Sequence, residues 1–354
     1  MSEIDYSQFI PVREFPDRGI KWLLESKENV HALLDIVASD IAKNLDFSKL
    51  EKLPQSFIPD NLRKQESDLL FLVPFHDEET DKVREVVVYI LIEHQSTPDR
   101  VMNFRLLFYM LQIWDSQRRA WLNEKIPKGQ WNFRPILPIV FYTGEQSWAK
   151  LLSMAELMDL PKALERFVPH HDTLFLNLKT KPKEELIADG HPFGYLLQVI
   201  QKENATKEEV TEAIELAVKH FDSFPSEQQN QWAKLMYYLV LLIRHRRGSD
   251  EQDELISVVK ESIYEHKRRE EVEEMGRTAA QELIEQGIAQ GIAQGIEQGI
   301  IQSKQEDLLE LMKVKFDSVP QSVTDKIKRM QDTGRLNELI RKILTVRSID
   351  EMGI

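Results

Sequence analysis

The sequence of 354 residues contains no cysteine, which excludes a disulfide framework and a zinc site built on thiolates. It also lacks a long hydrophobic run. The longest, LMYYLVLLI at 235–243, is far shorter than the about 20 residues that a membrane-spanning helix needs. The first residues, MSEIDYSQFI, carry neither the basic nor the apolar region of a signal peptide. We therefore expect a cytoplasmic protein with no membrane contact.

Common catalytic patterns are missing as well. The sequence has no P-loop, no HExxH and no Ser/His/Asp order, which argues against an ATPase, a zinc protease and an esterase. The net charge of -13 argues against indiscriminate nucleic-acid binding, because phosphate contacts supply most non-specific affinity. A local basic patch can still attract a phosphate backbone. Two groups are candidates for such a patch, although each also fits a solvated helix end: Arg118, Arg119, Lys125 and Lys128, and separately Arg244, Arg246 and Arg247.

Two apolar segments stand close together near the start of the chain, ESDLLFLVPF at 66–75 and EVVVYILIEHQS at 85–96. Runs that are apolar on both faces and rich in β-branched residues are typical of strands buried on both sides. The charged link HDEETDKVR between them fits an exposed turn. We predict a hairpin, in which the strand period of two places Glu93 and Gln95 on one face and turns His94 to the other.

A carboxylate marks the polar end of each predicted strand, because Asp68 begins the first and Glu93 ends the second. Burying either one unpaired is costly, and two neighbouring carboxylates repel unless a cation lies between them. Oxygen ligands of this kind suit a hard divalent ion such as Mg²⁺. We therefore predict that Asp68 and Glu93 hold a metal and that Gln95 reaches the same pocket.

A helix follows this hairpin in the sequence, with Asp99 as its cap and an end near Trp121. The spacing predicts one apolar stripe, formed by Phe104, Leu107, Phe108, Leu111 and Trp114. Arg105, Tyr109 and Gln112 share another face, which would point toward a phosphate or toward the metal pocket. The alternative is that Arg105 pairs with a carboxylate and Tyr109 belongs to the core.

These motifs resemble the Rpn family of recombination-promoting nucleases, also described as transposases, which belongs to the PD-(D/E)xK nuclease superfamily. The resemblance extends over about residues 15–245. It rests on Asp68 in SDLLF, Glu93 to Ser96 in LIEHQS, Arg105 and Tyr109 in FRLLFYML, and PIVFYTG at 138–144. One position departs from the superfamily, because Gln95 stands where the final lysine is usual, although glutamine is the usual form within Rpn-like proteins.

The resemblance implies a metal-dependent DNA endonuclease that is linked to recombination or mobile elements. Asp68, Glu93 and Gln95 would be its catalytic residues, Mg²⁺ its cofactor with Mn²⁺ or Ca²⁺ as alternatives, and DNA its partner. Arg105 and Tyr109 would contact substrate or support the site. The rival function is that of a catalytically degenerate core that binds DNA or protein through its C-terminal helices.

The implied fold class is α/β, with a restriction-endonuclease-like core of order α-β-β-β-α-β. Its mixed sheet is flanked by helices and followed by an all-helical C-terminal region. The expected parts are a nuclease-like core at 1–180, accessory helices at 181–266, a long glycine-repeat helix at 267–303 and a small helical domain at 304–354.

Periodicity locates the remaining elements. Helices are expected within 17–46 and throughout 183–266, and further strands at 135–144 and 172–178. Two capping boxes are expected in the helical part, at Thr206/Glu209 and Ser226/Gln229. In the C-terminal part, one stripe before Pro320 is expected to hold Leu308, Leu311, Met312 and Phe316.

A four-residue repeat, EQGIAQGIAQGIEQGI, occupies residues 285–300. Four glycines in a helix cost about 1 kcal/mol each relative to alanine, which close packing against a second helix would offset. A repeat of four drifts by ~40° each time around a helix, so a partner would wrap with right-handed sense. Two interpretations stay open, a flexible linker and a helix that associates with itself. We predict a homo-oligomer through this repeat.

Overall fold

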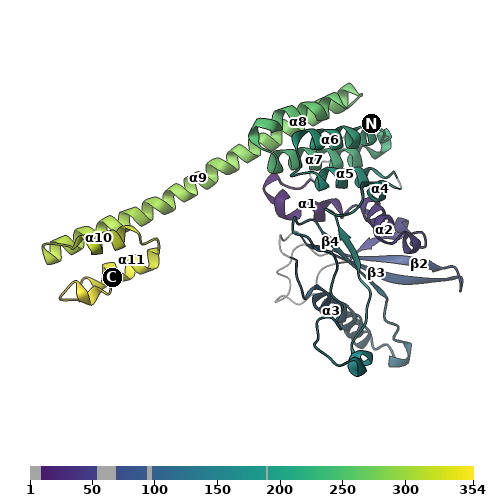
Figure 1. Cartoon of the computed structure of the whole chain (residues 1–354), viewed down its shortest axis with the longest axis horizontal. Coiled ribbons are helices and arrows are strands. Elements are labelled where there is room, and N and C mark those ends of the chain that lie inside the picture. The colour runs from purple at the N-terminus through teal and green to yellow at the C-terminus, as the bar shows by residue number, and fades with distance from the viewer. Residues whose placement is uncertain (1–8, 54–68, 94–97, 189) are drawn as a thin grey trace. The chain divides into compact units, whose positions relative to one another are not determined.

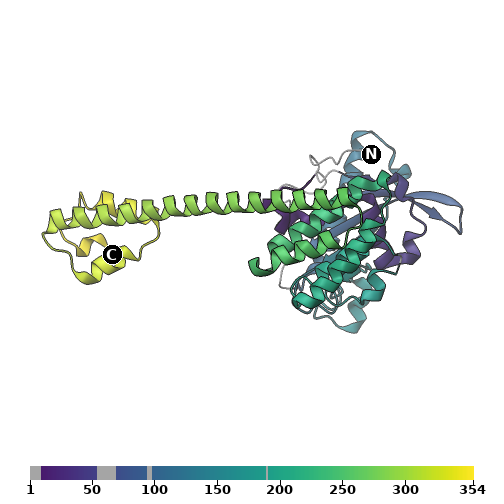
Figure 2. The same cartoon turned by 90° about the horizontal axis from the view of Figure 1, so that it is seen from above.

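The computed structural model describes residues 9–53, 69–93, 98–188 and 190–354. The chain divides into two compact units, residues 1–280 and 281–354. The first unit combines a sheet with helices, and the second is helical (Figure 1; Figure 2 gives a second view). Among the described residues, no helix combines the length and the apolar character that crossing a bilayer requires.

The first unit is built on a mixed five-stranded sheet in the order β1-β2-β3-β4-β5. Its strands are β1 (Glu51–Lys52), β2 (Leu69–Asp77), β3 (Lys82–Glu93), β4 (Ile136–Tyr142) and β5 (Leu174–Asn177). β1, β2 and β3 pair in antiparallel fashion, whereas β3, β4 and β5 run parallel. The predicted order and the mixed sheet are confirmed. β1 was not predicted, because two residues are too few to show a period.

The predicted hairpin is confirmed, and its strand pairing extends beyond the apolar segments into the charged link. Pairing continues to Asp77 opposite Lys82, so much of the charged link belongs to the strands. The Asp77 carboxylate accepts hydrogen bonds from the backbone of Glu79 (3.1 Å) and the hydroxyl of Thr80 (2.6 Å). The hydrogen bond from the Thr80 side chain is the main reason that the pKa of Asp77 is lowered. The remaining turn is exposed, as predicted.

Both faces of the hairpin are buried, as the apolar runs indicate. Leu70 and Tyr89 pair across the strands and face a cluster that includes α3 (Met102–Asn123), while Phe71 and Val88 pair on the other face. All four side chains are at most 1% exposed. α1 (Phe15–Leu23) and α2 (Lys27–Ala42) lie on the side of the sheet opposite α3 (Figure 1).

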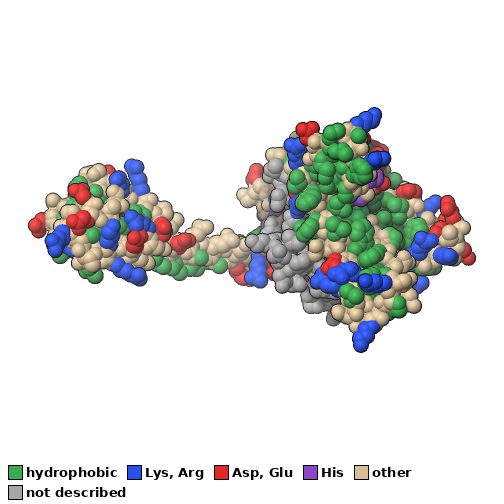
Figure 3. Space-filling view, turned by 90° about the horizontal axis from the view of Figure 1, so that it is seen from below, with side chains coloured by type: hydrophobic (Ala, Val, Ile, Leu, Met, Phe, Trp, Pro, Cys, Tyr) green, Lys and Arg blue, Asp and Glu red, His purple; other side chains and the backbone are tan. Residues whose placement is uncertain are grey.

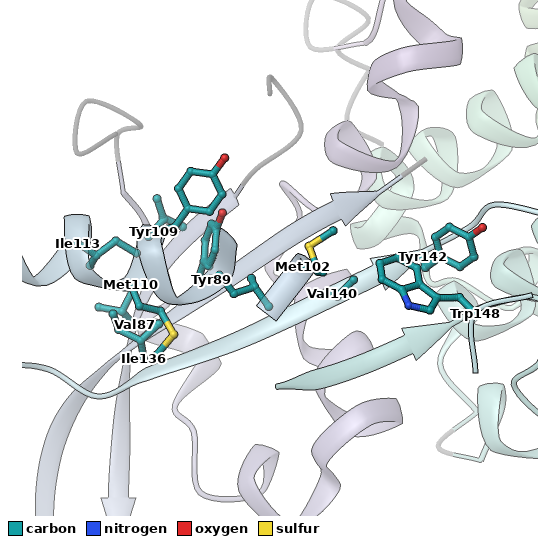
Figure 4. Close-up of a cluster of buried hydrophobic side chains, with 12 residues drawn as sticks. Val87, Tyr89, Met102, Tyr109, Met110, Ile113, Ile136, Val140, Tyr142 and Trp148 are labelled. Atoms are coloured by element: carbon teal, nitrogen blue, oxygen red, sulfur yellow. The ribbon is translucent and has the colours of Figure 1, made fainter. Parts of the chain in front are cut away.

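The structure shows that most of the apolar stripe predicted for α3 is wrong, although Trp114 packs against the buried cluster. Phe104, Phe108 and Leu111 are 52%, 36% and 51% exposed, and Leu107 and Trp114 are only partly buried. The side chains that pack on the sheet are Met102, Leu106, Tyr109, Met110 and Ile113 (Figure 4).

A polar side chain helps to fix this orientation of α3. Asn103 is 7% exposed and donates a hydrogen bond to the carbonyl of Leu152 (2.7 Å). Its side-chain oxygen accepts a hydrogen bond from Thr173 (3.1 Å). Because α3 turns this asparagine inward, the apolar side chains of the opposite face stay in solvent. Hydrophobic side chains gather on the face of the first unit that Figure 3 shows.

The helical stretch after the sheet agrees with prediction. Its helices are α4 (Lys183–Leu186), α5 (Pro192–Gln201), α6 (Lys207–Asp222), α7 (Gln229–Arg246) and α8 (Ser249–Glu261). The first capping box is confirmed, since Thr206 and Glu209 bond each other's backbone. The second is wrong. Gln229 is the first residue of α7, and its side chain donates to Glu271 (2.7 Å) in place of a capping bond.

The second unit contains the C-terminal part of α9 (His266–Phe316), together with α10 (Gln321–Lys328) and α11 (Thr333–Lys342). Its core holds Leu308 and Met312, as predicted, packed against Leu336 and Leu339 of α11. Leu311 is 38% exposed, so its predicted place on the same stripe as Leu308 and Met312 is wrong. The unit therefore has a small apolar centre of its own.

Candidate functional site

The carboxyl ends of the three parallel strands meet at one edge of the sheet. Glu93, the last residue of β3, is paired with Tyr142, which is paired with Asn177. The start of β2 lies near the same edge, because Leu69 is opposite Ile90. Ligands of open α/β sheets bind outside the carboxyl ends of parallel strands. This edge is therefore the candidate functional site.

The residues predicted to hold metal lie in the sequence directly beside these strand ends. Asp68 and Gln95 are outside the described residues, as is His94, and only the backbone of Glu93 is described. Metal binding by Asp68 and Glu93 thus stays a prediction. Within the described residues, no group of three or more His, Asp and Glu side chains could hold a metal ion.

Arg105 and Tyr109 are both described, on the first turns of α3. The Arg105 guanidinium donates to the Asp99 carboxylate (2.7 Å), and both side chains are partly buried. Tyr109 is 6% exposed, and its ring meets that of Tyr89 edge-on with 6.0 Å between the centroids (Figure 4). These positions match the alternative of a paired arginine and a core tyrosine. A role toward substrate stays a prediction.

Two buried polar groups shape the loop that follows β4. The Tyr142 hydroxyl donates to the carbonyl of Gln146 (3.0 Å). The Asn177 amide donates to the carbonyl of Trp148 (3.0 Å), and its oxygen accepts from the backbone of Lys179 (3.2 Å). The ends of β4 and β5 are therefore held to one loop by side chains of the strands themselves.

Lys179 lies two residues after β5 at the same edge, and sequence reasoning did not single it out. Its ammonium group contacts Glu145 (2.7 Å) and Glu203 (3.4 Å) and donates to the carbonyl of Ile200 (3.3 Å). The hydrogen bond from Lys179 is the main reason that the pKa of Glu145 is lowered. Because the Lys179 ammonium group is bound by two carboxylates and by a carbonyl at the end of α5, we assign this lysine a structural role. The only feature of the sequence that could have pointed to Lys179 is its place just after an apolar strand.

All five arginines proposed for a basic patch are paired with carboxylates. The pairs are Arg118 and Arg119 with Asp115, Arg244 with Asp253, Arg246 with Glu203, and Arg247 with Glu251. A neighbouring carboxylate offsets the positive charge that a phosphate would meet. These contacts agree with the alternative of ordinary helix ends.

The five-stranded mixed sheet, with the chain order α-β-β-β-α-β followed by β5 and with Glu93 as the last residue of the central strand, is that of a nuclease-like α/β core. The chain belongs to the family described as "Putative transposase, YhgA-like", whose profile matches residues 16–233. The match falls within the span of about 15–245 expected from the motifs. The resemblance to Rpn proteins is thereby confirmed.

Relatives from Escherichia coli strain K12 carry the Rpn name. The chain is 28% identical over 188 residues to the "Inactive recombination-promoting nuclease-like protein RpnE", covering 52% of this chain and 57% of that protein. It is 25% identical to the recombination-promoting nuclease RpnC, with the same coverage, and 29% identical to RpnA, covering 49% of this chain and 50% of RpnA. The matches thus span only about half of these relatives. No solved structure matches the chain.

Proposed function

We propose that this chain is a metal-dependent DNA endonuclease whose site lies at the carboxyl edge of β3. Membership of a family with relatives named as recombination-promoting nucleases supports the reaction class. The observation that carries the location is the strand register, which brings the end of β3 and the beginning of β2 to one edge. Asp68 and Glu93 are the neighbouring acidic positions in the sequence.

The donor set fits a hard divalent cation. Asp68 directly precedes β2 in the sequence and Glu93 ends β3, and their two carboxylates would supply oxygen ligands and leave positions for water and phosphate. Such a set suits Mg²⁺, with Mn²⁺ or Ca²⁺ as alternatives. The bound metal would lower the pKa of a water and stabilise negative charge on the phosphate. Asp68 and Glu93 would hold the ion, and Gln95 would orient the attacking water.

α3 would help to hold the strand end and the segment that carry this site. The ion pair between Arg105 and Asp99 fixes the segment just before α3, which joins the helix to the end of β3. The packing of Tyr109 on Tyr89 holds the first turns of α3 against that same strand. In this proposal, Arg105 and Tyr109 position the backbone that carries the ligands, and DNA is the substrate.

A second candidate function is a degenerate core that binds DNA or protein through its C-terminal helices. Two observations favour it: RpnE is named as inactive, and Gln95 replaces the lysine of the wider superfamily. A glutamine supplies no positive charge near the attacking water. Cleavage of DNA distinguishes the two functions, because the degenerate core leaves DNA intact with every metal.

The test is incubation of the full chain with supercoiled plasmid and Mg²⁺, Mn²⁺ or Ca²⁺. We expect nicked and linear products from the parent, none from Asp68→Ala or Glu93→Ala, and a smaller loss from Gln95→Ala. Glu78→Ala is the matched control, because it removes an exposed carboxylate from the turn of the same hairpin. Calorimetric titration with each metal alone should show binding lost only in the Asp68 and Glu93 variants. If both of these variants cut DNA like the parent, the assignment is wrong.

A further inference from the structure

The glycine repeat lies within one continuous helix, α9. A Cβ atom added at Gly287, Gly291, Gly295 or Gly299 would meet no atom within 4 Å among the described residues. Nothing described in this chain therefore requires glycine there. The four glycines still cost the helix about 1 kcal/mol each relative to alanine.

Isoleucine side chains project from the same stretch of helix. Ile284, Ile288, Ile292, Ile296 and Ile300 recur every four residues and are 47% to 63% exposed. Figure 3 shows hydrophobic side chains along one edge of this part of α9 and other residue types along the opposite edge. An apolar row of this length is unusual on a helix surface that faces only water.

The two rows form a ridge beside a groove. Each glycine directly precedes an isoleucine, so the rows run parallel along the helix, separated by about 100° of rotation. Ridges and grooves of i±4 spacing interdigitate when two helices cross at about −50°, close to the right-handed crossing of GxxxG pairs. One face thus carries both the isoleucine ridge and the glycine groove that would receive the ridge of an identical helix.

The charge of the repeat argues against DNA or a membrane surface as the binding partner of this helix face. Between Arg277 and Lys304 the chain has no basic residue, so the repeat lacks the positive charge that DNA or an anionic membrane surface would need. The only charged residues of the repeat, Glu285 and Glu297, share a row with Ala289 and Ala293. The glycine and isoleucine rows therefore carry no charge that would repel a second copy.

We infer that residues 285–300 form a two-copy interface, in which α9 of one chain crosses α9 of another through the glycine and isoleucine rows. Covering all of these isoleucines on two copies would remove at most on the order of 1,000 Å² from water, near the lower limit for a specific interface. A pair of that size dissociates reversibly, so the dimer depends on protein concentration. The cost of the glycines is offset by close approach of the two backbones.

Sedimentation velocity of the full chain over a concentration series tests the interface. We expect a reversible dimer for the parent and at least about a tenfold weaker association, or ~1.4 kcal/mol, for Gly291→Leu with Gly295→Leu, because the added side chains fill the groove. Ala289→Leu with Ala293→Leu is the matched control. It adds one carbon less per site, hardly changes helix propensity, and places the leucines on the row with the two glutamates, so it should leave the dimer intact.

A third variant separates packing from helix propensity. Ile292→Gln with Ile296→Gln removes the ridge without filling the groove and should also weaken association. Circular dichroism should show that all variants keep the helix. A parent that stays monomeric at all concentrations overturns the inference, as does a larger assembly or an unchanged dimer in the glycine variant.

Discussion

Two leucines on α3 allow a direct test of which face of this helix is buried. Leu106 is fully buried in the cluster between α3 and the sheet, whereas Leu111 is 51% exposed on the other side of the helix. The same substitution, leucine to alanine, can be made at both positions. Sequence periodicity alone predicts a large effect at Leu111, and the structure predicts it at Leu106.

The expected magnitudes differ severalfold. Leu106→Ala removes a fully buried side chain and leaves a cavity, which costs about 2–5 kcal/mol in the free energy of unfolding. Leu111→Ala removes a half-exposed side chain, and alanine is at least as good a helix former, so its effect should stay within about 0.5 kcal/mol. The difference follows from burial, since both positions lie within one helix.

Urea unfolding followed by tryptophan fluorescence is a suitable assay. All six tryptophans lie in residues 1–280, so the signal reports only the unit that contains α3. A shift in the midpoint without a change in slope would measure stability alone. Equal losses for the two variants, or a larger loss for Leu111→Ala, would refute the assigned orientation of α3.

Two further predictions concern a buried lysine and the register of β3. Burial lowers the pKa of Lys234, whose ammonium lies 4.8 Å from the centre of the Trp22 ring, from 10.5 to about 8. The unfolded chain therefore binds more protons between pH 8 and 10.5, and this group makes stability rise with pH in that window. Lys234→Met should raise the free energy of unfolding at pH 7 by up to about 3 kcal/mol, minus the cation–π attraction that the variant loses. Measured by urea unfolding, this gain in stability over the parent should shrink by pH 10. A gain that grows with pH would contradict the lowered pKa of Lys234. His94→Gln should keep most plasmid cleavage, because the strand period predicted from the sequence would turn residue 94 away from Glu93. A folded variant as inactive as Glu93→Ala would show that this predicted alternation is wrong.

The elements with a clear period could be predicted from sequence, and the orientation of α3 could not. The hairpin, β4 and the helices after the sheet each show one dominant pattern. The segment MNFRLLFYMLQIW is apolar on both sides of a helix, so two stripes fit equally well. The choice depends on tertiary contacts of Asn103 with Leu152 and Thr173, which no local pattern contains.

The candidate site, like the fold, could be predicted from the sequence only in part. The acidic positions Asp68 and Glu93 stand out because the first directly precedes an apolar run and the second ends one. The strand register brings Leu69, the neighbour of Asp68, to the edge where β3 ends. The contacts of Lys179 with Glu145 and Glu203 join positions far apart in sequence. Such pairs become visible only when the fold is known, because ionic residues at these spacings have no pattern of their own.

The four-residue repeat of α9 also has a consequence for changes in the length of this helix. One unit more or fewer keeps every glycine and every isoleucine in its row, because the insertion equals the spacing of the rows. It lengthens or shortens the helix by about 6 Å and rotates all later residues by about 40° around its axis. The length of this helix can therefore change by whole units while the two rows are preserved.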